Sequence, residues 1–328
     1  EFRRVLFRSA AGPAAYLGVA DGMIVGLGAA PPCAAPRTVT LSGVVLPGFI
    51  DMHAHPAEGG RESMMLDLSG ATTLEGLAEA VRSEAAAHPD AAWIEGAGWD
   101  AAVLDRLAPL HALDAVDRPV FLSSSDGHSA FVNTAAFHAA HLDPRRDPPG
   151  GHIDRDANGP TGWIRESAVD AVAAVMPAWD PSRTDVAVAR GLALFAAKGV
   201  TTILDANADA DSLASYRRLE EAGGLTARIF AAVEVDPGQV GRGLALTRRL
   251  RRFDSAMVTV AGPKLYMDGV VESETASLLA PYSDGRNEPL AFSDAELDRI
   301  VVATERAGLQ VHAHAIGDAA VQIGRAHV

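Results

Sequence analysis

Apolar residues recur along the chain in two patterns. Short runs are typical of buried strands, and stripes three or four positions apart are typical of helices. After an opening strand from Val45, the runs that predict strands are Val200–Leu204, Ala227–Val235, Val258–Met267 and Leu309–Ala315. Helical stripes fill the connections, most regularly from Ser182 onward. Strands that alternate with helices predict a parallel sheet joined by right-handed crossovers.

Two α/β architectures fit this alternation, a doubly wound sheet and a (β/α)8 TIM-type barrel. Five strands followed by the end of the chain fit a partial barrel. We therefore predict barrel strands one to five within residues 47–322. In either architecture, functional side chains gather at the carboxyl ends of the strands.

Two further segments do not follow the alternation. Residues 10–46 read as a small N-terminal β unit, because Asp21-Gly22 between apolar runs is a hairpin signal. From about residue 93 to 175 the alternation of strand and helix fails, and two glycine- and aspartate-rich pieces appear, Ser123–Asn133 and Asp147–Glu166. We predict an insertion there, placed after the first strand and helix of the barrel.

The two ends of the chain share an unusual relationship. One back-translation of R-V-L-F-R-S near the start is almost the reverse complement of one for I-G-R-A-H-V at the end. The shared string also resembles a short-read sequencing adapter. We therefore expect residues 1–9 and 323–328 to be adapter-like and non-native, and the natural chain to be truncated after strand five.

Composition and net charge limit the kinds of molecule that the protein is expected to bind. The formal net charge of −14 and the pI near 5.2 argue against nucleic acid or an anionic membrane surface. No apolar run reaches transmembrane length. The single cysteine, Cys33, excludes an intrachain disulfide framework, so a reducing, cytoplasmic location is expected. A small molecule is the expected partner, and homo-oligomerisation is left open.

Two histidines follow the opening strand, in P-G-F-I-D-M-H-A-H-P. Positions two apart in a strand share a face, so His53 and His55 are predicted to reach into one cavity. Two neutral imidazoles on one edge make half of a transition-metal site. H-x-H alone fits a pair of surface histidines better, but the apolar strand before it favours the metal site.

Three other positions are candidates for the same cavity. Lys264 lies within a predicted strand, where a buried ion pair with Asp268 is the alternative role. His312 and His314 share a face of the last strand, so one can bind metal while the other lines the pocket. His128 lies in the glycine- and serine-rich stretch S-D-G-H-S, which is poor core material.

Five pieces occur in a specific order: P-G-F-I-D-M-H-A-H-P, S-D-G-H-S-A-F-V-N, P-P-G-G-H-I-D-R-D-A-N-G-P-T-G-W-I-R-E, K-L-Y-M-D-G-V-V-E-S and H-A-H-A-I-G-D. Together they resemble the amidohydrolase 3 family of the metal-dependent amidohydrolase superfamily, the branch that holds N-substituted formamide deformylases. The resemblance covers residues 14 to about 322. One departure is Glu274, where family members often carry arginine.

The resemblance implies a site and a reaction. His53, His55 and His314 would bind one or two divalent ions, with zinc as the expected metal and Lys264 as a carbamate ligand. His128 and His312 would contact substrate. The implied activity is hydrolysis of an amide or formamide, a C–N bond other than a peptide bond, by metal-activated water.

Part of the implied machinery is missing from this sequence. The family's general acid/base is an aspartate on the last barrel strand, so no catalytic residue is assigned here and the chain as given is expected to be inactive. Ester or lactone hydrolysis by the same site is one alternative. A barrel relative that serves as a non-catalytic scaffold is another, although four convergent ligand-type residues argue against it.

Overall fold

The computed structural model describes residues 16–29, 37–40, 45–100, 104, 108–271 and 274–326. The chain divides into two compact units, Glu1–Phe49 and Ile50–Val328. The ends predicted to be adapter-like fall at residues 1–9, which lie outside the described residues together with Cys33, and at 323–328, of which only the backbone to residue 326 is described.

The first unit contains the expected hairpin. Strands β1 (Tyr16–Ala20) and β2 (Met23–Gly28) pair in antiparallel register. Asp21 and Gly22 connect them with φ angles of 49° and 74°. Two consecutive residues in the left-handed region are what a tight hairpin turn requires, so the Asp-Gly signal is confirmed.

A five-stranded sheet with the order β13-β12-β11-β10-β3 carries the predicted alternation. Its strands are β3 (Phe49–Ala54), β10 (Val200–Asp205), β11 (Arg228–Glu234), β12 (Val258–Tyr266) and β13 (His312–His314). The pairs from β10 to β13 are parallel. The sheet is curled like half a barrel. The curl brings its two edge strands, β3 and β13, together at one point, where Nε2 of His312 lies 3.0 Å from Nδ1 of His53.

Helices occupy the connections after strand β3. They are α2 (Pro56–Glu62), α7 (Pro181–Ala197), α8 (Ala210–Glu221), α9 (Val240–Leu250), α10 (Asp294–Arg306) and α11 (Asp318–Ala326). Side-chain caps define several starts. Asp180 accepts hydrogen bonds from the backbone of Ser182 and Arg183, and Ser293 with Glu296 forms a capping box.

Strand β3 differs from the expectation of a buried strand. Phe49 and Ile50 are 61% and 52% exposed, because β3 is an edge strand that pairs only with β10 in the described sheet. Edge strands leave one row of backbone groups and the adjoining side chains uncovered. The apolar run therefore correctly predicts a strand, but the prediction that this strand is buried is wrong.

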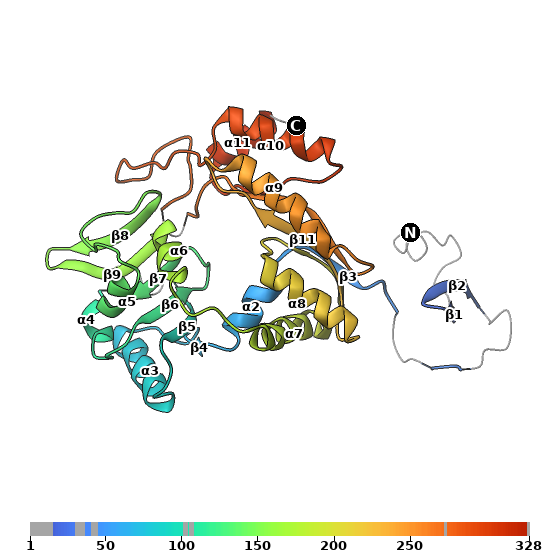
Figure 1. Cartoon of the computed structure of the whole chain (residues 1–328), viewed down its shortest axis with the longest axis horizontal. Helices are drawn as coiled ribbons and strands as arrows, with labels where there is room; N and C mark the ends of the chain where they lie inside the picture. Colours follow the sequence, from blue (N-terminus) through green and yellow to red (C-terminus); the bar gives the residue numbers. More distant parts are fainter. Residues whose placement is uncertain are drawn as a thin grey trace. The chain divides into compact units, whose positions relative to one another are not determined.

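Helix α2, which follows β3 directly, packs closely against α7 (Figure 1). A Cβ atom on Gly60 would lie 2.0 Å from the carbonyl oxygen of Ala187, and one on Gly191 would lie 2.0 Å from that of Pro56. Only glycine permits this approach. His55 is the N-cap residue of α2, so the contact between the helices fixes where that histidine lies.

A second, six-stranded sheet has the order β4-β5-β6-β7-β9-β8. Its strands are β4 (Leu66–Asp67), β5 (Ile94–Trp99), β6 (Val120–Ser124), β7 (Ser129–Val132), β8 (Gly151–Asp156) and β9 (Gly159–Glu166). Its helices are α3 (Leu74–Ala87), α4 (Leu110–Leu113), α5 (Thr134–Ala139) and α6 (Ser167–Ala173). Figure 1 shows these elements from blue to green.

This sheet begins earlier than the predicted insertion of about 93–175. Strand β4 has only two residues, too few to give a periodic signal, and helix α3 contacts β4 and β5 of this sheet. The core of the sheet contains Trp99 stacked on Phe131 with ring centroids 3.9 Å apart.

Among the described helices, none combines the length and apolar character needed to cross a membrane.

Candidate metal centre

A cavity of about 530 Å³ lies at the carboxyl ends of the curled sheet. His53 and His55 reach it from the end of β3, Lys264 from β12 and His314 from β13. His128 reaches it from the turn between β6 and β7 of the second sheet. Five of the six residues predicted for the site therefore line one cavity.

The imidazoles form two contacting groups. The ring of His53 lies 5.4 Å from that of His55 and 4.9 Å from that of His312, measured between centroids. The ring of His314 lies 5.2 Å from that of His128. Thus His312, predicted to contact substrate, lies against a predicted metal ligand and is absent from the cavity lining in the described part of the chain.

Strand pairing explains this grouping. In the parallel register of β12 and β13, Lys264 is opposite His312 and Tyr266 is opposite His314. Side chains two apart share a face, so all four point to the same side. Nε2 of His314 lies 3.0 Å from the carbonyl oxygen of Gly269, its hydrogen-bond acceptor, which leaves Nδ1 as the nitrogen that could bind a metal.

Lys264 is fully buried, and its Nζ has no hydrogen-bond partner among the described residues. Burial lowers the pKa of Lys264 to about 8, while the charge of Glu234 opposes the shift. Nζ lies 4.5 Å from the centre of the Tyr266 ring. An amine in this setting gives up its proton far more easily than a surface lysine does.

The alternative role for Lys264, an ion pair with Asp268, is not what the structure shows. Asp268 accepts hydrogen bonds from the backbone nitrogens of Ser277, Ile316 and Gly317. Its carboxylate therefore ties the loop after β13 to the loop after β12. Among the described residues no carboxylate forms a salt bridge with Lys264.

Four histidines share a lowered pKa, in each case because burial disfavours the charged ring. The Lys264 charge adds to the shift at His53 and His55. The pKa of His312 falls to about 4 through burial, Lys264 and the neighbouring rings. These imidazoles are therefore neutral at physiological pH, which is the form that binds transition metals.

His128 has a different environment. Its Nδ1 lies 3.1 Å from Oε2 of Glu166, at the end of β9. Burial lowers the pKa of His128, but the hydrogen bond and the charge of Glu166 outweigh burial and raise it. Glu166 was not predicted as a site residue. The one available signal was its place at the end of P-T-G-W-I-R-E, one of the pieces that carried the resemblance.

Further carboxylates line the cavity and have raised pKa values. Burial raises the pKa of Glu58, and burial with the nearby Glu58 charge raises that of Glu62 to about 7. Burial is also the first cause for Asp170 and Glu234. At the end of β10, Asp205 is 1% exposed and accepts a hydrogen bond of 2.8 Å from the Tyr216 hydroxyl. Asp205 does not line the cavity.

The donor set fits a divalent transition metal. Neutral imidazoles and an unpartnered buried amine are ligand-type groups. Nδ1 of His55 makes no hydrogen bond among the described residues, and Oε2 of Glu58 lies 3.5 Å from it. No three His, Cys, Asp or Glu side chains in the described ranges already surround one point closely enough for an ion. The agreement with a metal site is therefore one of chemistry and position, and Lys264 lines the same cavity as the histidines.

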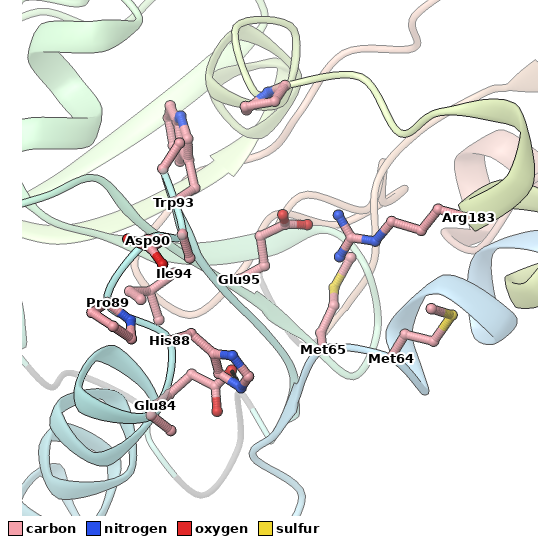
Figure 2. A pocket seen from close by; sticks show the side chains of 14 residues that line it. Met64, Met65, Glu84, His88, Pro89, Asp90, Trp93, Ile94, Glu95 and Arg183 are labelled. Carbon is pink, nitrogen blue, oxygen red and sulfur yellow. Dashed lines mark ion pairs between the residues drawn. The ribbon is translucent and has the colours of Figure 1, made fainter.

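A second hollow of about 490 Å³ lies elsewhere, beside β5 and α3. Figure 2 shows the Glu95 carboxylate and the Arg183 guanidinium pointing toward each other there, with Met65 close by. None of the predicted site residues lines it. Its lining includes Glu84 and His88, whose side chains form an ion pair with each other, but no lysine.

The family model described as "Amidohydrolase family" matches residues 42–327. YtcJ of Bacillus subtilis, whose name assigns it provisionally to the amidohydrolases, is 29% identical over 93% of this chain and 60% of its own length. The exoenzymes regulatory protein AepA of Pectobacterium carotovorum is 31% identical over 94% of this chain and 71% of its own length. This chain thus spans well under the full length of these relatives.

Two solved structures are also similar. An uncharacterized metal-dependent hydrolase from Pyrococcus horikoshii has a TM-score of 0.64 and 28% sequence identity, over 86% of this chain and 55% of its own. One from Pyrococcus furiosus has a TM-score of 0.61 and 26% identity, over 86% and 57%.

Proposed function

The chain belongs to the amidohydrolase family, and on that premise we propose that it forms the metal-binding part of a hydrolase that cleaves C–N bonds other than peptide bonds. The observation that carries the proposal is the buried, unpartnered amine of Lys264 in one cavity with three neutral imidazoles. The full-length protein would act on a small-molecule amide or formamide.

His53, His55, Lys264 and His314 would hold the metal. Zinc suits imidazole nitrogen and oxygen donors, and one or two ions are compatible with this set. A bound divalent ion lowers the pKa of water toward neutrality and polarises a carbonyl group. Within the chain itself, the low pKa values of the imidazoles keep their nitrogen lone pairs free for binding.

Lys264 would serve as a carbamate. A neutral amine adds to carbon dioxide, loses one proton and becomes an anionic oxygen donor. The pKa of Lys264, lowered to about 8 by burial, makes the neutral amine accessible near physiological pH. Among the described residues, no side chain or backbone group forms a hydrogen bond with Nζ that would compete with this reaction.

The cavity also limits what the substrate can be. Its volume of about 530 Å³ suits a small molecule. Glu58, Glu62, Asp170 and Glu234 line it, so the cavity does not offer the strongly basic surface that a polyanion such as a nucleic acid requires. Ester or lactone cleavage by the same groups is the competing proposal, because both reactions begin with attack on a carbonyl.

A matched pair of substrates separates the two proposals. The full-length, zinc-loaded protein is assayed with N-benzylformamide and benzyl formate, which differ only in the atom that leaves. Each kcat/KM is divided by the rate of the uncatalysed hydrolysis. We expect the larger acceleration for the formamide. A larger acceleration for the formate would establish the esterase proposal, and hydrolysis of neither would support a non-catalytic role.

A further inference from the structure

We propose that Glu166 is a positioning residue, whose carboxylate holds the ring of His128 so that Nε2 faces the substrate in the cavity. The inference rests on the proposed function, since it concerns the same cavity. It extends that function by assigning a role to the second sheet. This sheet would supply His128 as part of the cavity wall and Glu166 as the group that orients the His128 ring.

His128 is held at three of its atoms. Its backbone nitrogen donates a 2.9 Å hydrogen bond to Asp126, and its carbonyl oxygen accepts one of 3.0 Å from the backbone nitrogen of Glu166. Its Nδ1 lies 3.1 Å from Oε2 of Glu166. No described residue hydrogen-bonds to Nε2, and the ring lines the cavity. With Nδ1 engaged, Nε2 is the nitrogen left for a substrate.

The Glu166 carboxylate is itself held from the other side. The Thr275 hydroxyl, in the loop after β12, donates to Oε1. This arrangement needs a glycine at position 269, since a Cβ there would lie 2.6 Å from Oε1 of Glu166 and 2.0 Å from the Thr275 hydroxyl oxygen. The carbonyl of the same Gly269 accepts the hydrogen bond from His314. One cluster therefore orients both His128 and a proposed metal ligand.

The backbone of Glu166 is strained. Its φ of 51° and ψ of −132° lie in a region that residues other than glycine rarely occupy. Glu166 is the N-cap residue of α6, yet its side chain makes no capping hydrogen bond to that helix. Strain of this kind persists where the surroundings enforce it, often at functional sites. Here the strained backbone directs the carboxylate to His128 instead of to its own helix.

This arrangement follows the logic of oriented histidines in other enzymes. A third group that accepts a hydrogen bond from Nδ1–H fixes the tautomer and the direction of the ring, and the other nitrogen acts on the substrate. The competing role for Glu166 is a purely structural link between the second sheet and the loop after β12. The two roles predict different results for conservative variants.

The first test needs no substrate. Long-range ¹H–¹⁵N correlation spectra of the metal-free chain, recorded at a pH where His128 is neutral, report which nitrogen of each histidine carries a proton. We expect the Nδ1–H form at His128 in the wild type and a mixture of tautomers in Glu166→Gln, with Thr275→Ser, which keeps the hydroxyl, as the matched control. An unchanged His128 tautomer in Glu166→Gln would overturn the positioning role, whatever the activity of the protein.

The second test uses the full-length, zinc-loaded protein and N-benzylformamide. Glu166→Gln is expected to lower kcat by about 10–100-fold with zinc content unchanged. Residues that act as a unit are not additive, so the double variant Glu166→Gln/His128→Ala should be no slower than His128→Ala alone. Losses that multiply in the double variant would overturn the proposal. If the wild type hydrolyses neither N-benzylformamide nor benzyl formate, the result would instead count against the proposed function.

A third variant guards against simple misfolding. Glu166→Gly relieves the backbone strain while it removes the carboxylate. We expect it to melt at a higher temperature than Glu166→Gln, yet to lose kcat to the same extent. Recovery of kcat in Glu166→Gly would show that the backbone shape matters and the carboxylate does not, and would overturn the proposal.

Discussion

At the scale of single residues, Lys264 is the position where stability and function conflict most clearly. A fully buried amine without a hydrogen-bond partner destabilises the folded chain, because its hydration is lost without replacement. Such a group persists where a ligand supplies the missing interaction. The chain offers a matched control, since its two lysines are Lys264 and the exposed Lys198.

Lys264→Met therefore has two expected effects. In the metal-free chain it should raise the free energy of unfolding by about 1–3 kcal/mol, because an unsatisfied buried polar group is removed. In the presence of zinc it should lower the amount of bound metal. Urea unfolding and elemental analysis measure the two effects. Lys198→Met should change neither, and full metal occupancy in Lys264→Met would make Lys264 a structural residue.

Asp205 gives a pH dependence with a defined sign. Burial raises its pKa from 3.8 to about 7, although hydrogen bonds from Tyr216 and Asn207 oppose the shift. The folded state therefore holds this proton more tightly than the unfolded state does. The stabilisation is complete below about pH 4 and is lost as the pH rises through about 7.

The variant Asp205→Asn isolates this effect. The free energy of unfolding of the wild type, minus that of the variant, should fall by on the order of 1–4 kcal/mol between about pH 4 and pH 8. Urea unfolding of both proteins across this range measures the difference. A difference that stays constant with pH would mean that Asp205 has an ordinary pKa in the folded chain.

At the scale of elements, the contact between α2 and α7 positions the first histidines of the site. The two adjacent glycines of α2 differ sharply in their surroundings. A Cβ at Gly60 would collide with the backbone of Ala187, whereas one at Gly59 would meet nothing within 4 Å. Because His55 is the residue that directly precedes α2, any shift of this helix moves a proposed ligand.

Gly60→Ala should destabilise the chain by about 1–3 kcal/mol through overpacking, and it should weaken zinc binding. Gly59→Ala should be neutral or stabilising by up to about 1 kcal/mol, because alanine favours a helix. Urea unfolding and zinc titration measure both variants. Equal effects of the two substitutions would contradict the close packing of α2 on α7.

Sequence reasoning reached some elements and missed others for physical reasons. The parallel strands from β10 to β13 and the Asp-Gly hairpin were predictable because periodicity and turn chemistry are local. The two-residue strand β4 was not, since its pairing with β5 is decided by distant residues. Likewise, the H-x-H and lysine positions were readable from strand ends. The link from His128 to Glu166 spans 38 positions and depends on how the second sheet folds.

At the scale of the whole molecule, the curled sheet has two edges in the described part of the chain, β3 and β13. On β3, Phe49, Ile50 and Met52 are exposed. Exposed apolar edge strands readily pair with other chains. The chain spans 60% of the length of YtcJ. The self-association of this segment is therefore measured separately from the activity of the full-length protein.

We expect the segment of residues 14–322, expressed alone, to self-associate as its concentration increases and to lack amidase turnover. Ile50→Lys should reduce the association, because a charge on an edge strand opposes pairing. Sedimentation at several concentrations measures this effect, with Leu194→Lys, at an exposed position on α7, as the control. A monomeric wild-type segment that hydrolyses N-benzylformamide would contradict this expectation.

The central claim is that His53, His55, Lys264 and His314 bind one metal centre. Anomalous diffraction at the zinc absorption edge tests it most directly, on crystals of the protein grown with zinc. The account predicts a peak in the cavity between these four side chains, with ligand distances of about 2.0–2.2 Å. An empty cavity in crystals that bind zinc only at other positions would contradict it.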